Sequence, residues 1–193
     1  MSESARKIIT MSIWSVLFLF IIRCLVGWKE LTEIINNSEI FKGGYTLFGY
    51  AGEAVGITTI IMTCFNKWLW KLKLLHWVSG GMPVLAKKYK GKIRYNYNNI
   101  EQKRDIEIEI AQTFLTITVK SRTKESMSDS ITAVIEKGKM IFTYLNTPNA
   151  EIQDRSTVHY GTAIIDVDDP KHLVGNYYTG RLSRGSMDLK AVS

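Results

Sequence analysis

Hydrophobic and polar residues follow two different patterns along the 193-residue chain. Two almost uninterrupted apolar runs, 8–26 and 47–65, come first. Each is close to the roughly 20 residues that a helix needs to cross a bilayer. From residue 92 onward the period changes to two, and Ile106, Ile108 and Ile110 alternate with acidic residues. This alternation is typical of a strand with one face in water. The pattern therefore predicts two transmembrane helices followed by an all-β domain.

The β-domain is predicted to form a small antiparallel, lipocalin-like barrel of about eight strands. Short turns separate several strands, as at 136–139 and 168–171. A two-sheet sandwich is the alternative arrangement. A barrel of this size encloses side chains or one small ligand. The strands are expected at 92–98, 105–110, 115–120, 129–137, 139–147, 157–168, 172–179 and 185–192.

Basic residues near the apolar runs set the expected orientation. Arg6 and Lys7 precede the first run, and three lysines at 67–73 follow the second. Residues 28–46 are expected to form a connecting loop, which is rich in glutamate. For a chain in the inner membrane, the positive-inside rule then places both termini in the cytoplasm. Tryptophans alternate with the lysines at 66–78, which predicts an interfacial continuation of the second helix. A cleaved signal peptide is disfavoured because no small-residue cleavage site follows the first run.

The break at Gly80-Gly81-Met82-Pro83 is the expected domain boundary. Residues 1–79 are predicted to form a transmembrane helical hairpin with its interfacial extension. Residues 84–193 are predicted to form a cytosolic barrel that binds a ligand.

The second apolar run carries small residues and one charge that an inert anchor does not require. Gly52 and Gly56 form a small-xxx-small pair, which allows a neighbouring helix to approach closely. That neighbour is either the first helix of the same chain or a second copy. Glu53 needs a partner, water or a proton if it lies within the bilayer, unless it reaches the interface. Gly52, Glu53 and Gly56 are therefore the candidates for membrane assembly.

Composition excludes several other classes of protein. The net charge is +7, but basic and acidic residues are interspersed in the β-domain, which argues against DNA or RNA binding. The two cysteines, Cys24 and Cys64, lie in the apolar runs, so a disulfide framework is not expected. No catalytic or phosphate-binding motif is present, and the aspartates at 166–169 are better explained as a turn than as a metal site. We expect no enzymatic activity, no metal and no cofactor.

Tyrosines and arginines of the predicted strands are the candidates for ligand binding. Tyr95 and Tyr97 share the parity of Ile93 and are expected to line the interior. A tyrosine ring can stack on a base while an arginine pairs with a phosphate. The alternative is that the tyrosines belong to the core and the arginines to a solvated rim. The candidate set is Tyr95, Tyr97, Arg122, Tyr144, Tyr160, Tyr177 and Arg181.

The two apolar runs, the Trp and Lys collar and the cysteine-free β-domain together resemble a known family. The closing segment, Gly175-Asn176-Tyr177-Tyr178-Thr179-Gly180-Arg181 followed by Gly185-Ser186-Met187-Asp188-Leu189, adds to the resemblance. Along its whole length the chain resembles the two-transmembrane β-barrel effectors of bacterial CBASS anti-phage systems.

The resemblance implies a complete mode of action. In such systems a nucleotidyltransferase detects infection and makes a cyclic oligonucleotide. The barrel of the effector binds this cyclic di- or trinucleotide, the protein self-associates, and the helices disrupt the inner membrane, which causes abortive infection. Two other hypotheses stay open, namely a constitutive membrane-tethered scaffold or lipid-binding barrel, and a subunit of a larger membrane complex.

Overall fold

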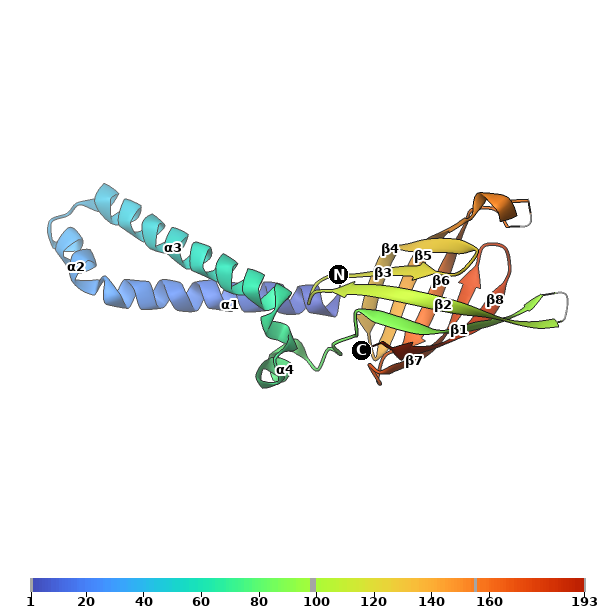
Figure 1. Ribbon diagram of the computed structural model, residues 1–193. Coiled ribbons are helices and arrows are strands. Elements are labelled where there is room, and N and C mark those ends of the chain that lie inside the picture. Colours follow the sequence, from blue (N-terminus) through green and yellow to red (C-terminus); the bar gives the residue numbers. More distant parts are fainter. Residues whose placement is uncertain (1, 98–99, 155, 193) are drawn as a thin grey trace. The chain divides into compact units, whose positions relative to one another are not determined.

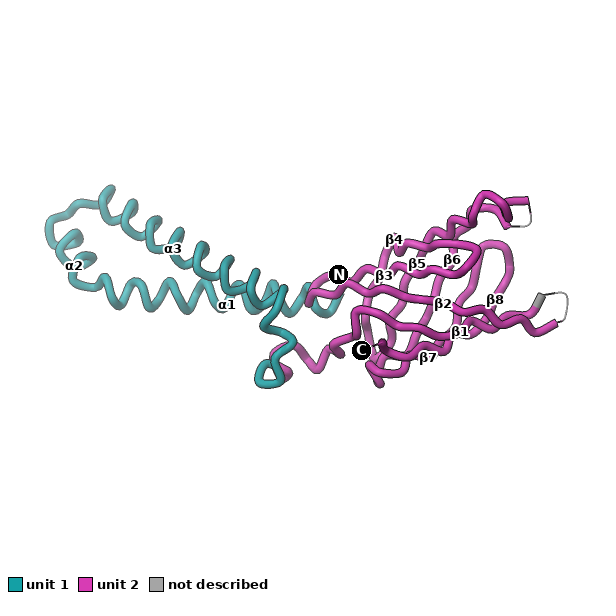
Figure 2. The backbone as a smooth tube through the Cα atoms, in the orientation of Figure 1, with its two compact units in different colours: residues 1–75 teal, residues 76–193 magenta. Residues whose placement is uncertain are grey.

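The computed structural model describes residues 2–97, 100–154 and 156–192, without the side chain of Tyr97. The chain divides into two compact units, residues 1–75 and 76–193 (Figure 2). The first unit is helical and the second is a closed antiparallel barrel with eight strands among the described residues (Figure 1). The predicted fold class is confirmed.

The helical unit contains the two long apolar helices that the sequence predicts. These are α1 (Glu3–Val26) and α3 (Ile40–Lys67), and both are long and apolar enough to cross a membrane. The shorter helix α2 (Trp28–Asn36) connects them. The expectation of a loop at 28–46 is therefore wrong. Leu31 and Ile34 are three residues apart on one face of α2, and Ile34 is buried, so tertiary packing stabilises a helix there.

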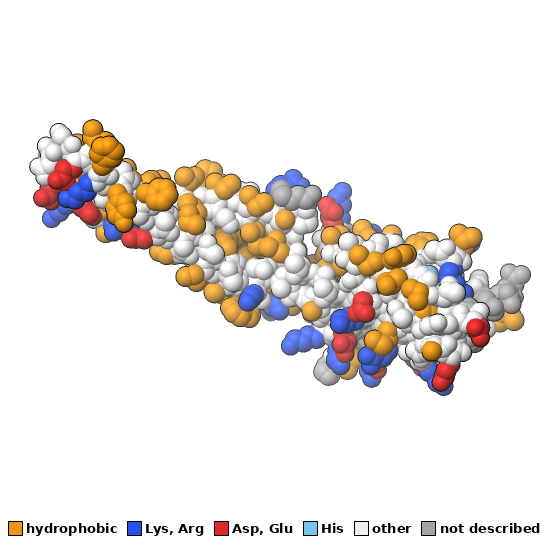
Figure 3. Space-filling model, turned by 90° about the horizontal axis from the view of Figure 1, so that it is seen from above, with side chains coloured by type: hydrophobic (Ala, Val, Ile, Leu, Met, Phe, Trp, Pro, Cys, Tyr) orange, Lys and Arg blue, Asp and Glu red, His pale blue; other side chains and the backbone are white. Residues whose placement is uncertain are grey.

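Helices α1 and α3 pack against each other along a narrow strip. Tyr50, Ala54, Thr58 and Phe65 are the buried residues of α3, and the hydroxyl of Thr58 lies 3.2 Å from that of Ser15 on α1. Outside this strip many large apolar side chains are exposed on both long helices, and Figure 3 shows such side chains along the helical unit. Apolar residues that point outward are what a helix pair needs in lipid.

Short helical turns follow α3 in place of one continued helix. These are η1 (Leu69–Lys71), η2 (Lys73–Leu75) and α4 (His76–Ser79), the last of which begins the second unit. Gly80 and Gly81 then adopt positive φ angles, which glycine does without steric cost. The chain thus changes direction at Gly80 and Gly81, within the break at residues 80–83, before it reaches the first strand of the barrel.

Each strand of the barrel pairs antiparallel with its neighbours in the chain, and β1 pairs with β8 to close it. At this closing seam Gly91 lies opposite Leu189. The first four strands are β1 (Lys88–Tyr97), β2 (Ile100–Gln112), β3 (Ile117–Arg122) and β4 (Ser126–Glu136). The others are β5 (Lys139–Pro148), β6 (His159–Asp166), β7 (His172–Thr179) and β8 (Arg184–Ala191).

Inward-facing residues change from apolar to polar along the barrel. On β2 the buried residues Ile110, Ile108 and Ile106 are followed, at the same parity, by Arg104 and Gln102. Strand β5 shows the same order, from Met140 and Phe142 through Tyr144 to Asn146. One end of the barrel is therefore a packed hydrophobic core, and the other end has a polar lining.

The apolar end is closed by side chains. Tyr89 is fully buried there, and its hydroxyl accepts a hydrogen bond from Ala86 N and donates one to Pro170 O. Leu173 and Leu189 are also fully buried. Among the described residues, side chains therefore fill this end, and the space for a ligand lies at the polar end.

Candidate functional site

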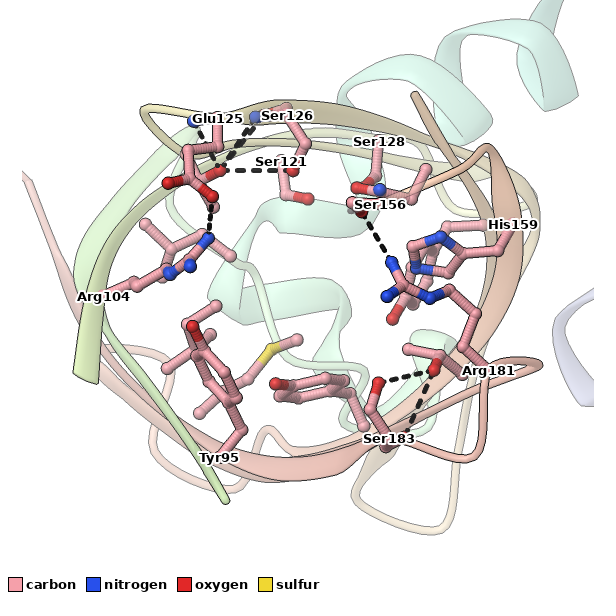
Figure 4. A pocket seen from close by; sticks show the side chains of 18 of the residues that line it. Tyr95, Arg104, Ser121, Glu125, Ser126, Ser128, Ser156, His159, Arg181 and Ser183 are labelled. Atoms are coloured by element: carbon pink, nitrogen blue, oxygen red, sulfur yellow. Dashed lines mark hydrogen bonds and ion pairs between the residues drawn. The ribbon is translucent and has the colours of Figure 1, made fainter. Parts of the chain in front are cut away.

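The polar end of the barrel contains a cavity of about 410 Å³. This volume falls within the roughly 300–1,000 Å³ of typical ligand pockets. All eight strands contribute lining residues, and the apolar floor includes Ile93, Ile106, Phe142 and Met187. Figure 4 shows the polar side chains that surround the space above this floor.

Two arginines enter the cavity from opposite walls (Figure 4). Arg104 comes from β2, lies 5.4 Å from the centre of the Tyr95 ring and forms an ion pair with Glu125. Arg181 comes from the turn between β7 and β8, and its Nη1 donates a 2.6 Å hydrogen bond to the Ser156 hydroxyl. Guanidinium groups form paired hydrogen bonds with phosphate oxygens. The cavity thus offers two anion-binding groups facing each other.

Three tyrosines also line the cavity. They are Tyr95 on β1, Tyr144 on β5 and Tyr177 on β7. Burial raises the pKa of Tyr144 to about 12 and also raises the pKa of Tyr177. Both phenols therefore stay neutral at physiological pH and can donate hydrogen bonds. Their rings offer surfaces on which a flat aromatic ligand can stack.

Amides and hydroxyls complete the lining. Asn146 is buried and accepts a 2.9 Å hydrogen bond from Ser128 through Oδ1. Asn96, Gln102 and His159 also face the cavity. Such groups recognise the edges of bases and the hydroxyls of sugars.

Four of the residues predicted from the sequence share this cavity, namely Tyr95, Tyr144, Tyr177 and Arg181. Arg122 does not line it, because β3 directs Ile117 and Val119 inward and so turns Arg122 outward. Tyr160 is 65% exposed on the outer face of β6, since Gly161 and Ala163 take the inward positions. The side chain of Tyr97 lies outside the described residues. The binding role of all seven stays a prediction.

Arg104 and Glu125 line the cavity but are not among the residues predicted from the sequence. Arg104 has the parity of Ile106, Ile108 and Ile110, so extending that alternation by one step would have placed it inside. Glu125 lies in the turn between β3 and β4, where no alternation exists to be read.

The three membrane-assembly candidates all lie on α3, but in different surroundings. Glu53 accepts a 2.7 Å charged hydrogen bond from Arg23 Nε on α1. The Arg23 guanidinium also lies 3.9 Å from the centre of the Tyr50 ring. At Gly52 and Gly56, a Cβ would meet no described atom of another element within 4 Å. The glycine face is therefore not used for packing against α1.

Among the described residues, no group of three His, Cys, Asp or Glu side chains is placed to hold a metal ion. The chemistry of the cavity is that of hydrogen bonding, charge pairing and stacking.

Comparisons with known proteins agree with this arrangement of helices and barrel. The model of the family described as "Cap15, cyclic dinucleotide receptor domain" matches residues 81–191. CD-NTase-associated protein 15 from Staphylococcus schleiferi is 31% identical over 174 residues, which cover 86% of this chain and 93% of that protein. A match of this length includes residues of the helical unit as well as the barrel.

Proposed function

This chain belongs to the Cap15 cyclic dinucleotide receptor family, and from that membership we propose that it is a CBASS anti-phage effector. Its barrel binds a cyclic oligonucleotide second messenger, most simply a cyclic dinucleotide, although a cyclic trinucleotide has the same chemistry. A nucleotidyltransferase supplies this ligand. The effector acts by binding and assembly rather than by catalysis.

The observation that carries the proposal is the pair of arginines across the cavity. A cyclic dinucleotide is a ring with two phosphodiester anions on opposite sides. Arg104 and Arg181 enter from opposite walls, so each phosphate can meet one guanidinium. Each guanidinium is planar and can form two parallel hydrogen bonds with a phosphate group, so the two arginines are well suited to bind phosphates.

The remaining lining matches the two bases and sugars. Tyr95 and Tyr177 provide ring surfaces for stacking, and base stacking on aromatic side chains contributes about 1–3 kcal/mol per base. Asn96, Gln102 and Asn146 provide both donors and acceptors for base edges. The cavity is thus suited to a ligand that is anionic at two points and aromatic between them.

The helical unit carries out the proposed membrane step. We infer that α1 and α3 lie in the inner membrane with both termini in the cytoplasm, where a soluble messenger reaches the barrel. Ligand binding promotes self-association through the Gly52 and Gly56 face of α3, which is free of contacts with α1. Clustering of the helices then disrupts the membrane and stops the infected cell.

Binding is tested by titrating the full chain, purified in detergent, with a panel of cyclic di- and trinucleotides in a calorimeter. We expect at least one compound to bind with micromolar or tighter affinity. Linear dinucleotides of the same base composition are the control, because they lack the closed ring. Absence of binding across the panel, together with a co-purified lipid detected by native mass spectrometry, would instead support the lipid-binding alternative.

The replacement Glu53→Gln is expected to reduce ligand-induced leakage of dye from vesicles by about threefold. It leaves Arg23 without its carboxylate, and a polar contact between membrane helices contributes about 0.6 kcal/mol on average. The matched control is Glu39→Gln, which removes an exposed ion pair with Lys42 in the same unit. Ligand affinity should stay unchanged in both variants. Leakage at the wild-type rate in Glu53→Gln would show that the pair has no part in the membrane step.

A further inference from the structure

Glu125 brings a negative charge to a cavity that is otherwise suited to anions. Its carboxylate accepts a charged hydrogen bond from Arg104 Nη1, as Figure 4 shows. The Glu125 side chain is 27% exposed and that of Arg104 is 40% exposed, so the pair lies at the boundary between cavity and solvent. Glu125 would thus compete with a ligand phosphate for the Arg104 guanidinium.

The backbone that carries Glu125 is held firmly in place. Asn149 N donates a 2.8 Å hydrogen bond to Glu125 O, and Asn149 Nδ2 donates one to Lys124 O. The Thr123 hydroxyl accepts hydrogen bonds from the backbone N–H groups of Glu125 and Ser126. Because these contacts fix the turn, the carboxylate can leave Arg104 by rotation of its own side chain, without movement of the strands.

The charges of the lining do not balance a dianionic ligand while the pair is closed. Arg104 and Arg181 are the Lys or Arg residues among the described lining, and Glu125 is the acidic residue. The two arginines and the one glutamate together give a net charge of about +1, whereas a cyclic dinucleotide carries two phosphodiester charges. A second anion at Arg104 would also be repelled by a carboxylate that stayed in place.

We propose that Glu125 is an internal counter-ion that neutralises Arg104 in the empty barrel and is displaced by one phosphodiester of the ligand. The inference rests on the proposed binding function and names the residue that sets the affinity threshold of this site. Glu125 keeps small anions from Arg104, because a single phosphate ion gains too little elsewhere in the cavity to replace it. A ring that also engages Arg181 and the tyrosines gains enough to make the exchange favourable.

The exchange explains why a partly exposed ion pair suits this position. Pairs of this exposure are weak, so one can open at small cost. A fully buried pair would resist displacement, and a missing carboxylate would leave Arg104 open to any cellular anion. The geometry therefore sets a threshold that every anion must exceed, and affinity is lower than it would be without the carboxylate.

The test measures affinity in the full chain with Glu125→Gln, which keeps the size of the side chain and removes its charge. The probes are inorganic pyrophosphate and the panel of cyclic dinucleotides, titrated by calorimetry in detergent. We expect both kinds of probe to bind roughly three- to tenfold more tightly to Glu125→Gln than to wild type. The matched control is Glu107→Gln, the same replacement at an outward-facing residue that pairs with Lys90. Its affinities should equal those of the wild type.

The double variant Arg104→Gln with Glu125→Gln shows whether the gain acts through Arg104. Relative to Arg104→Gln alone, the second replacement should add no affinity, because interacting residues are not additive. Weaker binding of guanine-containing ligands alone in Glu125→Gln would mean that the carboxylate reads a base, and uniformly weaker binding would mean that it positions Arg104. Either result overturns the inference.

The same titrations distinguish a failure of the proposed function from a failure of the counter-ion inference. If no cyclic dinucleotide binds but pyrophosphate binds more tightly to Glu125→Gln, the messenger hypothesis falls and the counter-ion role stands. If neither pyrophosphate nor any compound of the panel binds to the wild type or to the variant, Glu125 does not neutralise an anion-binding site and the inference is wrong.

Discussion

Replacement of Arg181 by alanine is expected to lower the affinity of the full chain for its cyclic dinucleotide by roughly 10- to 100-fold. The guanidinium enters the cavity from the turn between β7 and β8, opposite Arg104, and would lose its contact with one phosphate. Hydrogen bonds to charged groups contribute about 1.5–3 kcal/mol each, which sets this range. Calorimetric titration of wild type and variant measures the change.

Arg184→Ala is the matched control for this prediction. Arg184 is three residues further along the chain, exposed on β8 and absent from the cavity lining. Its removal lowers the net charge by the same amount and should leave affinity within about twofold of wild type. Equal losses in the two variants would mean that long-range charge, rather than contact, explains the effect. Unchanged affinity in Arg181→Ala would remove that residue from the site.

Replacement of Gly91 by alanine is expected to destabilise the barrel by about 3 kcal/mol, which corresponds to a fall in Tm of roughly 10 °C. A Cβ at this position would lie 1.9 Å from the backbone oxygen of Asp188 on the neighbouring strand β8. Because that atom belongs to the backbone, the clash is relieved only by separating β1 from β8 at the seam that closes the barrel. Thermal unfolding followed by circular dichroism measures the change.

Gly180→Ala is the control for the barrel glycines. A Cβ at Gly180 would lie 3.6 Å from Tyr160 O, which is an ordinary contact. Its Tm should therefore stay close to that of the wild type. A Gly91→Ala protein with wild-type Tm would show that the seam can widen at no cost.

The fold could be predicted from the sequence because each unit has one dominant periodicity. The alternation that begins at Ile93 places Tyr95 inward, and the structure agrees. The alternation fails as a guide at β6, where Ile164 and Ile165 are both apolar and the parity of Tyr160 cannot be read. The exposed Ile164 shows that an outer-face residue of this barrel need not be polar.

The cavity residues are harder to predict than the fold, because a charged residue of a strand faces the interior of this barrel. A charged residue in a strand is expected to face solvent on the outside, and Arg104 faces solvent through the open end of the barrel. This becomes visible only when the closed topology and the polar end are known. Glu125 depends on a turn conformation fixed by Asn149, more than twenty residues away in sequence, which no local pattern encodes.

The chain enters the barrel at its closed end, far from the polar cavity. Leu85 N donates a hydrogen bond to Gln112 Oε1, and Gln112 Nε2 donates one to Pro83 O, which ties the incoming segment to the last residue of β2. Arg104 lies eight residues back along that strand, or about 27 Å at roughly 3.4 Å per residue. A ligand in the cavity therefore cannot touch the segment that leads to the helices. Under the proposed function, a change that the ligand causes at the open end of the barrel would have to be transmitted along the stiff strands, or be recognised there by neighbouring molecules.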